Sequence, residues 1–302
     1  MNEINGKIDT VLASVGIKNY ERKPLVADAS NRRYERILAN QQSYMLMIAP
    51  PSTEDVRPFI KVAEVLLKEG LNAPDILARD VENGLLVLQD FGDDSYSHVL
   101  RNGANEIELY EAAVEVLEAL PVYADDIHEY SQEKLLQEAL LYIDWLATDA
   151  DKEGFIAIWK KLIGSLSGNN RLVMRDYHAD NLMWLPDNNG VQRVGLLDFQ
   201  DAVLGNAAYD YVSLLEDARR DVSAQTVATI LKGKSEQFLL DYAILGAQRN
   251  LKIIGIFHRL NKRDGKPRYL DFLPRVWNHY NNDLRHPALA ELKTWMDNNA
   301  RG

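Results

Sequence analysis

The most informative part of the sequence is Val173-Met174-Arg175-Asp176-Tyr177-His178-Ala179-Asp180-Asn181, followed after a short interval by Leu196-Leu197-Asp198-Phe199-Gln200-Asp201. An apolar lead-in places Asp176 on a loop, and a second apolar strand ends at Asp198. Phosphoryl transfer needs this order of groups: a carboxylate that orients and deprotonates a hydroxyl, then an amide and another carboxylate that hold Mg²⁺ on the nucleotide phosphates. Magnesium prefers hard oxygen ligands and usually takes only one or two from protein, so Asn181 and Asp198 suit it.

A hairpin is expected between these two stretches. The strand-like runs 182–185 and 191–197 are joined by Pro186-Asp187-Asn188-Asn189-Gly190, and such a cluster of turn residues between two apolar runs indicates a hairpin loop. Because Asn181 begins the first strand and Asp198 follows the second, we expect these two side chains to lie side by side. The competing explanation is two unrelated surface carboxylates and a turn asparagine.

The run from Asp176 to Asn181, together with Asp198, resembles the catalytic loop and metal-binding aspartate of the aminoglycoside phosphotransferase and choline kinase superfamily. Within that superfamily, nearly the whole chain is similar to the bacterial anomeric kinases of N-acetylmuramate and N-acetylglucosamine, which belong to a cell-wall (peptidoglycan) recycling route. The segments that carry this resemblance are Met174-Arg175-Asp176-Tyr177-His178, Leu197-Asp198-Phe199-Gln200-Asp201-Ala202, Ala208-Tyr209-Asp210-Tyr211-Val212-Ser213-Leu214-Leu215, and Gln248-Arg249-Asn250-Leu251-Lys252 with Gly255-Ile256-Phe257.

The resemblance implies an α+β, protein-kinase-like bilobal fold. A small β-rich lobe over residues 1–90 would bind the nucleotide, and a large helical lobe over residues 91–302 would carry catalysis and bind the substrate. It also implies ATP and Mg²⁺ as cofactors and the anomeric (C1) hydroxyl of the amino sugar as the acceptor. The element pattern agrees. Strands are predicted at 22–27, 34–38, 43–48, 76–78 and 85–88, and helices at 3–15 and 55–69. From about residue 94 the chain outside the hairpin is predicted to be almost all helical, with helices at 106–120, 131–147 and 152–166 among them.

Two segments are candidates for nucleotide contact. Ser30, Asn31, Arg32 and Arg33 occupy the place of a nucleotide-covering loop, although this loop is not glycine-rich, and a polar hairpin tip is the competing explanation. Gln89-Asp90-Phe91 is predicted as the hinge whose backbone groups contact the adenine. Kinases place a lysine on the third strand, whereas this strand reads Tyr44-Met45-Leu46-Met47-Ile48. Arg33 is the first candidate for the replacing cation and Arg32 the second.

The remaining candidates surround the proposed base. Asp176 would accept the proton of the attacking hydroxyl, and Arg175 would brace the loop. Asp210 resembles the buried aspartate that steadies the catalytic loop in this superfamily, with Arg175 as its expected partner. His178 is expected to brace the loop or to contact the sugar. The other substrate-binding candidates are Gln200 and Asp201, which could bind sugar hydroxyls, and Arg249 and Lys252, which could meet an acidic sugar substituent or form a solvated helix face.

The composition limits the possible classes. With 302 residues, 46% of them hydrophobic and 26% charged, the chain is ordinary for a globular protein with a substantial core. It has no cysteine, which excludes disulfides and thiolate metal sites. A net charge of −11 argues against nucleic acid as a partner. The N-terminus has no signal-peptide pattern, and no run approaches the ~18 apolar residues of a membrane span, so we expect a cytoplasmic protein without a membrane partner.

Two alternatives stay open at this point. An aminoglycoside or amino-alcohol phosphotransferase would use the acidic helical part to attract a cation. A non-catalytic nucleotide-binding scaffold would explain the missing strand lysine, although the set of Asp176, Asn181 and Asp198 counts against it. The sequence leaves the preferred sugar, the nucleotide and the oligomeric state open, with a monomer as the expectation.

Overall fold

A computed structural model describes residues 2–25, 31–168 and 171–299 of the chain. The described chain divides into two compact units. The first comprises Met1–Ala104 and Asp180–Asp201, and the second comprises Asn105–Ala179 and Ala202–Gly302. The lobes expected over 1–90 and 91–302 stay a prediction. Among the described helices, none has the length and apolar character needed to cross a membrane.

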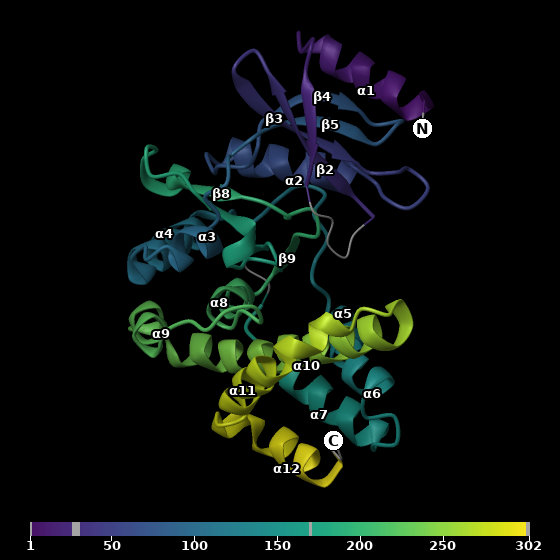
Figure 1. The fold of residues 1–302 in the computed structure, drawn as a ribbon. Helices are drawn as coiled ribbons and strands as arrows, with labels where there is room; N and C mark the ends of the chain where they lie inside the picture. Colours follow the sequence, from purple (N-terminus) through teal and green to yellow (C-terminus); the bar gives the residue numbers. More distant parts are fainter. Residues whose placement is uncertain (1, 26–30, 169–170, 300–302) are drawn as a thin grey trace. The chain divides into compact units, whose positions relative to one another are not determined.

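The first unit is built on a five-stranded antiparallel sheet with the order β1-β2-β3-β5-β4 (Figure 1). Its strands are β1 (Glu21–Pro24), β2 (Arg33–Ala39), β3 (Gln42–Ile48), β4 (Ile76–Asp80) and β5 (Leu85–Gln89). Its helices are α1 (Asn2–Ser14), α2 (Arg57–Lys68) and α3 (Tyr96–Arg101). The strand expected at 22–27 ends at Pro24, and residues 26–27 lie outside the described part.

Helix α1 covers one face of this sheet. Burial alternates along β2, where Ile37 and Ala39 are buried and the residue between them is only partly so, as the two-residue period of a strand requires. Ile8, Val11 and Leu12 of α1 are buried in the same cluster. The cluster is completed by Ile17, Leu46, Ile48, Leu85 and Val87.

The predicted hairpin is confirmed as β7 (Leu182–Trp184) and β8 (Val194–Leu196). Residues 191–193, expected in the second strand, form the one-turn 3-10 helix η2 (Gly190–Arg193) instead. It belongs to the first unit because backbone hydrogen bonds tie it there. The N–H of Leu196 donates to the carbonyl of Asn72 at 2.8 Å, and the N–H of Trp184 donates to the carbonyl of Asp94 at 2.7 Å. A hairpin distant in sequence thereby becomes part of the sheet unit.

The second unit is mainly helical. Its helices are α4 (Glu106–Ala119), α5 (Gln132–Ala139), α6 (Leu141–Trp145), α7 (Lys152–Gly164), α8 (Ala208–Leu215), α9 (Ala224–Leu231), α10 (Glu236–Asp264), α11 (Leu273–Asp283) and α12 (Ala290–Asn299), with 3-10 turns η3 (Pro267–Phe272) and η4 (Pro287–Leu289). Helix α10, drawn in green to yellow in Figure 1, packs against α5, α6, α8 and α11. Its ends follow the usual capping chemistry, with Ser235 accepting the N–H of Phe238 and Gly265 at a φ of 64°.

Two short strands of the second unit lie before and after the segment of the chain that belongs to the first unit. β6 (Arg171–Val173) pairs antiparallel with β9 (Val203–Gly205). The chain leaves β6 through the loop that carries Asp176, passes through η1 (Ala179–Asn181) and the hairpin, and returns along β9. The α+β prediction is confirmed, whereas the single helix expected at 131–147 is wrong, because it breaks at Leu140 into α5 and α6.

The break lies beside a close approach of two helices. A Cβ atom added to Gly255 of α10 would lie 2.4 Å from the carbonyl carbon of Leu141 in α6. We therefore expect Gly255→Ala to lower the free energy of unfolding by about 3 kcal/mol, measured by urea denaturation. Gly164→Ala is the matched control, because a Cβ at this position meets no atom within 4 Å. The substitution also replaces a glycine, which disfavours helix, by alanine. It should be neutral or stabilising by up to about 1 kcal/mol; equal losses for both variants would contradict this packing argument.

Candidate active site

The loop that carries Asp176 is held in an unusual backbone conformation. Arg175 has a φ of 70°, a left-handed conformation that is unfavourable for a side chain other than glycine and that needs support from its surroundings. The support comes from α8. The carboxylate of Asp210 accepts the N–H groups of Met174 at 2.6 Å and Arg175 at 2.9 Å, and the hydroxyl of Ser213 donates to the carbonyl of Arg175 at 3.1 Å.

The predicted pairing of Asp210 with Arg175 therefore needs a correction. Asp210 binds the backbone of Arg175, whereas the guanidinium of Arg175 binds Glu138 at 2.5 Å. The backbone N–H and the guanidinium of one residue can bind different carboxylates, and the sequence pattern does not reveal which group takes which partner. Burial raises the pKa of Asp210 to about 7, against the two backbone hydrogen bonds.

Asp176 lies among positive charges. Burial would raise the pKa of its carboxyl, but nearby Lys252, Arg249 and Arg175 outweigh burial and hold that pKa below its usual value. Asp176 is therefore ionised at neutral pH and able to accept a proton. The second unit thus brings together Asp176 and the predicted residues on helix α10, although they are far apart in the sequence.

His178 is buried, with only 5% of its surface exposed. Its Nε2 lies 3.1 Å from Nη1 of Arg219. Burial lowers the pKa of His178, so the ring is neutral and its Nε2 can accept from the guanidinium. The neighbouring hydroxyl of Tyr177 donates to the carbonyl of Ala113 at 2.8 Å. These contacts favour the loop-bracing role of His178 over the sugar-contact role.

The two predicted cations on α10 are not on a solvated face. Arg249 is buried and its Nη1 lies 3.5 Å from the carbonyl oxygen of Glu216. Lys252 has 13% of its side chain exposed, and its Nζ lies 3.3 Å from Glu138 and 3.2 Å from the hydroxyl of Tyr209. The alternative of a solvated helix face is therefore wrong.

The first unit carries the predicted metal ligands at the ends of the two hairpin strands. The N–H of Leu197 donates to the carbonyl of Asn181 at 3.0 Å, so the backbone of Asn181 lies next to Leu197, the residue before Asp198. Asp198 has a φ of 56°. The ring of the following residue, Phe199, is buried and stacks on Phe59 of α2 with centroids 4.7 Å apart, which fixes this turn.

These residues fit a hard cation. Asp198 is exposed and Asn181 is half-buried, and a carboxylate and an amide supply the oxygen ligands that Mg²⁺ prefers. Gln200 donates from Nε2 to Asp198 at 3.0 Å, which orients the carboxylate, and Asp201 is exposed. No group of three or more His, Cys, Asp or Glu side chains suited to a metal ion occurs among the described residues.

The covering-loop candidates differ from one another. Ser30 lies outside the described residues. The N–H of Asn31 donates to Glu54 at 3.3 Å, and Arg32 forms an ion pair with Glu54 at 3.3 Å with 13% of its side chain exposed. Arg33 is exposed on β2. Burial raises the pKa of Tyr34 to about 12, with Arg32 opposing and Asp198 adding to the rise, so both of these charges lie close enough to act on Tyr34.

The predicted hinge is anchored to the sheet. Asp90 binds the guanidinium of Arg36 in β2 at 2.6 Å and accepts the N–H of Gly92 at 2.9 Å. The N–H of Gln89 donates to the carbonyl of Asp75 at 2.9 Å. Phe91 packs on the hairpin, where a Cβ at Gly195 would lie 2.8 Å from its ring. The segment Gln89-Asp90-Phe91 therefore has a fixed backbone.

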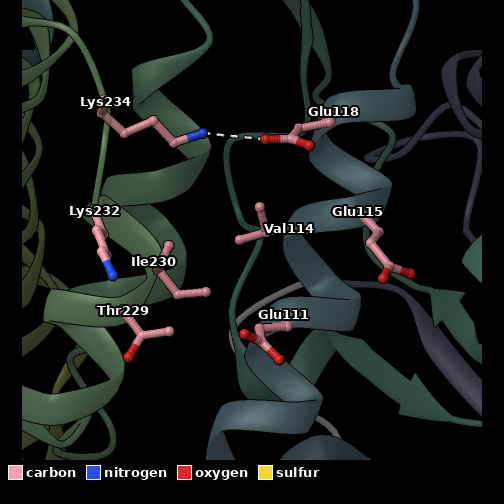
Figure 2. Close-up of a pocket in the computed structure, with 8 residues that line it drawn as sticks. All are labelled: Glu111, Val114, Glu115, Glu118, Thr229, Ile230, Lys232 and Lys234. Atoms are coloured by element: carbon pink, nitrogen blue, oxygen red, sulfur yellow. Dashed lines mark hydrogen bonds and ion pairs between the residues drawn. The ribbon is translucent and has the colours of Figure 1, made fainter.

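A groove in the second unit contains none of these candidates. It lies between α4 and α9 and has a volume of about 360 Å³ (Figure 2). Glu118 on one wall forms an ion pair with Lys234 on the other at 3.1 Å. The remaining lining residues are Glu111, Val114, Glu115, Thr229, Ile230 and Lys232. The groove is lined by three glutamates and two lysines, so the charges of its walls compensate only in part.

The sequence interpretation missed residues that support the site. Glu138, Tyr130 and Tyr209 surround Arg175 and Lys252. A signal for Glu138 did exist: it shares the apolar face of α5 with Leu135 and Ala139, which are buried. A carboxylate at such a position indicates a buried ion that requires partners.

The sheet unit with its hairpin and the helical unit with its braced aspartate define a kinase-like phosphotransferase. Solved structures support this fold at low sequence identity. A choline kinase, LicA from Streptococcus pneumoniae, superposes with a TM-score of 0.65 at 14% identity over 96% of this chain and 99% of that chain. The ADP-bound aminoglycoside phosphotransferase APH(2'')-Ib gives a TM-score of 0.61 at 14% identity over 91% of this chain and 97% of that chain.

The chain belongs to the phosphotransferase enzyme family, whose model matches residues 21–245. Two relatives are named N-acetylmuramate/N-acetylglucosamine kinase. The protein from Caulobacter vibrioides is 37% identical, with 95% of this chain and 94% of the relative covered. The protein from Pseudomonas aeruginosa is 39% identical, with 89% of this chain and 86% of the relative covered. Membership of this family implies use of a nucleotide.

Proposed function

We propose that this protein transfers the γ-phosphoryl group of ATP to the anomeric hydroxyl of N-acetylmuramate and N-acetylglucosamine, with Mg²⁺, in the recycling of cell-wall sugars. The observation that carries the proposal is the ionised carboxylate of Asp176 on a braced loop among cations. The names of the relatives from Caulobacter vibrioides and Pseudomonas aeruginosa supply the acceptor class.

Asp176 would orient the acceptor hydroxyl and take its proton as the phosphoryl group is transferred. An anomeric hydroxyl is more acidic than an ordinary alcohol, so a carboxylate with a lowered pKa is a sufficient base. Positioning supplies most of the rate in this chemistry. The bonds from Asp210 to the loop backbone therefore serve catalysis by fixing where the carboxylate points.

Asn181 and Asp198 would hold Mg²⁺ on the nucleotide phosphates, where the ion would supply charge neutralisation. Gln200 would keep the Asp198 carboxylate oriented through its hydrogen bond, and Asp201 would remain available for the sugar. Backbone groups of the anchored hinge at Gln89-Asp90-Phe91 would contact the adenine. We further propose that the chain acts as a cytoplasmic monomer, where ATP is supplied.

The cation that replaces the strand lysine is, in this proposal, Arg32. Its guanidinium is largely buried and oriented by Glu54, and both Arg32 and Asp198 act on Tyr34. Arg33 is exposed on β2. This reverses the order of the two candidates taken from the sequence, because a preorganised guanidinium loses less side-chain freedom on binding phosphate than an exposed one.

Arg32→Ala is expected to raise the KM for ATP roughly 10- to 100-fold, since a charged hydrogen bond contributes about 1.5–3 kcal/mol. Initial rates at varied ATP concentration measure this. Arg57→Ala is the matched control, because Arg57 is an exposed arginine paired with Asp55 in the same unit, and its KM should stay within about twofold of the parent. A large loss in Arg33→Ala with a normal Arg32→Ala would return the role to Arg33.

The decisive assay is ADP release with Mg-ATP and a panel of N-acetylmuramate, N-acetylglucosamine, glucose, choline and kanamycin. Turnover with the two N-acetyl sugars is expected. The methyl glycoside of N-acetylglucosamine, whose C1 hydroxyl is blocked, should be inert, which separates anomeric transfer from transfer to C6. Turnover with choline or kanamycin alone would identify an amino-alcohol or aminoglycoside phosphotransferase, and nucleotide binding without turnover would indicate a scaffold.

A further inference from the structure

One buried carboxylate in the second unit contacts two of the cations that act on Asp176. Glu138 of α5 is 6% exposed. Its Oε1 lies 2.5 Å from Nη2 of Arg175, and its Oε2 lies 3.3 Å from Nζ of Lys252 and accepts the hydroxyl of Tyr130. Burial would raise the pKa of Glu138, but Lys252 and Arg175 lower it below the usual value, so the carboxylate is charged.

The two cations are also enclosed by aromatic rings. The guanidinium carbon of Arg175 lies 5.1 Å from the centre of the Tyr130 ring, and Nζ of Lys252 lies 5.8 Å from the centre of the Tyr209 ring. The two rings pack edge to face with centroids 5.3 Å apart. Cations over aromatic faces in a desolvated place gain electrostatic stabilisation, so this arrangement holds both cations in defined positions.

The direction of the Lys252 ammonium bears on its role. An ammonium has three donors, and two of those of Lys252 meet Glu138 and the hydroxyl of Tyr209 at 3.3 and 3.2 Å. Lys252 is also the charge that contributes most to lowering the pKa of Asp176. Two of the ammonium's donors therefore meet one carboxylate and one phenol hydroxyl of the protein, and its charge acts on Asp176, whereas the sequence suggested that it meets an acidic substituent of the sugar.

We infer that Glu138 is a positioning residue of the phosphotransfer reaction, which fixes Lys252 and Arg175 beside Asp176 so that Lys252 serves the base and not the recognition of the sugar's acidic group. This inference rests on the proposed function. The negative charges of Glu138 and Asp176 oppose the positive charges of Lys252 and Arg175, and Arg249 adds positive charge near Asp176. Removing one member leaves an uncompensated buried charge, and a small misplacement of the reacting groups is enough to lower the rate strongly.

Glu138→Gln keeps the shape of the side chain and removes its charge. We expect kcat to fall roughly 10- to 100-fold with both N-acetyl sugars, while the ratio of their KM values stays constant within about twofold. Glu133→Gln is the matched control, because it is the same substitution on the exposed side of the same helix, and its kcat should stay at the parent value. Thermal unfolding of both variants separates loss of activity from loss of fold.

Lys252→Met tests the same arrangement without changing Glu138, so a poorly folded E138Q leaves the inference testable. Removing this positive charge raises the pKa of Asp176, so the acid limb of kcat against pH should move upward by about 1 pH unit. The K252M variant keeps the other groups that interact electrostatically with Asp176. These groups are His178, Arg249, Arg175 and Asp210.

Three outcomes would overturn the inference: an E138Q kcat equal to that of E133Q, an unmoved acid limb in K252M, or losses confined to the KM for N-acetylmuramate. The last result would assign Lys252 to the acidic substituent. Turnover of the parent protein on the sugar panel reports on the proposed function by itself, and the variants are compared with the parent on whichever acceptor it uses. The two failures are therefore distinguishable.

Discussion

Asp176→Asn is expected to lower kcat by about 10³- to 10⁴-fold while the affinity for Mg-ATP stays near the parent value. Asparagine has nearly the same shape, so the loop keeps its place, but an amide cannot take the proton of the acceptor hydroxyl. A positioned general base contributes roughly 10²- to 10⁴-fold, and Asp176 also balances the charge of Lys252 and Arg175. The upper part of that range is therefore expected.

The measurement is steady-state ADP release with N-acetylglucosamine, together with calorimetric titration of the nucleotide. Asp180→Asn is the control on the same loop, because Asp180 is exposed and carries no proposed role. Retention of more than a tenth of the parent kcat in Asp176→Asn would show that another group, or water, accepts the proton. A loss of nucleotide affinity in the same variant would place Asp176 among the nucleotide ligands.

Asp198→Asn is expected to lower kcat by on the order of 10²- to 10³-fold and to raise the Mg²⁺ concentration needed for half-maximal rate. Of the two proposed metal ligands, only Asp198 carries a negative charge, and the amide of asparagine would bind the metal ion more weakly. A bound metal ion contributes several kcal/mol to stabilising the charge of the transition state. Asparagine is the appropriate replacement because it tolerates the left-handed φ of 56° at this position, so the effect is not one of backbone strain.

Rates measured across a Mg²⁺ titration test this second expectation. Asp187→Asn is the control in the same hairpin, since Asp187 lies exposed in the loop between the two strands. Partial recovery of the Asp198→Asn variant at high Mg²⁺ would support ligation. An unchanged Mg²⁺ requirement, with or without loss of kcat, would exclude Asp198 as a metal ligand.

Local sequence was sufficient for the elements around the site. The turn residues from Pro186 to Gly190 predicted the hairpin, and the structure forms it with Leu182 paired to Leu196. The sheet strands and the late helices followed from their periodicity in the same way. These features depend on neighbouring residues in the chain, whose preferences for turns, strands and helices act over short distances.

The sequence by itself determined the fold class, the hairpin that brings Asn181 next to the segment entering Asp198, and the loop position of Asp176. Only the tertiary structure decided the partners of the charged groups. In the structure, Asp210 binds the loop backbone and Glu138 binds both Arg175 and Lys252. Glu54 orients Arg32. The physical reason is that a buried charge must find a counter-charge wherever packing places one. Lys252 and Glu138 lie on different helices, and no local pattern links them.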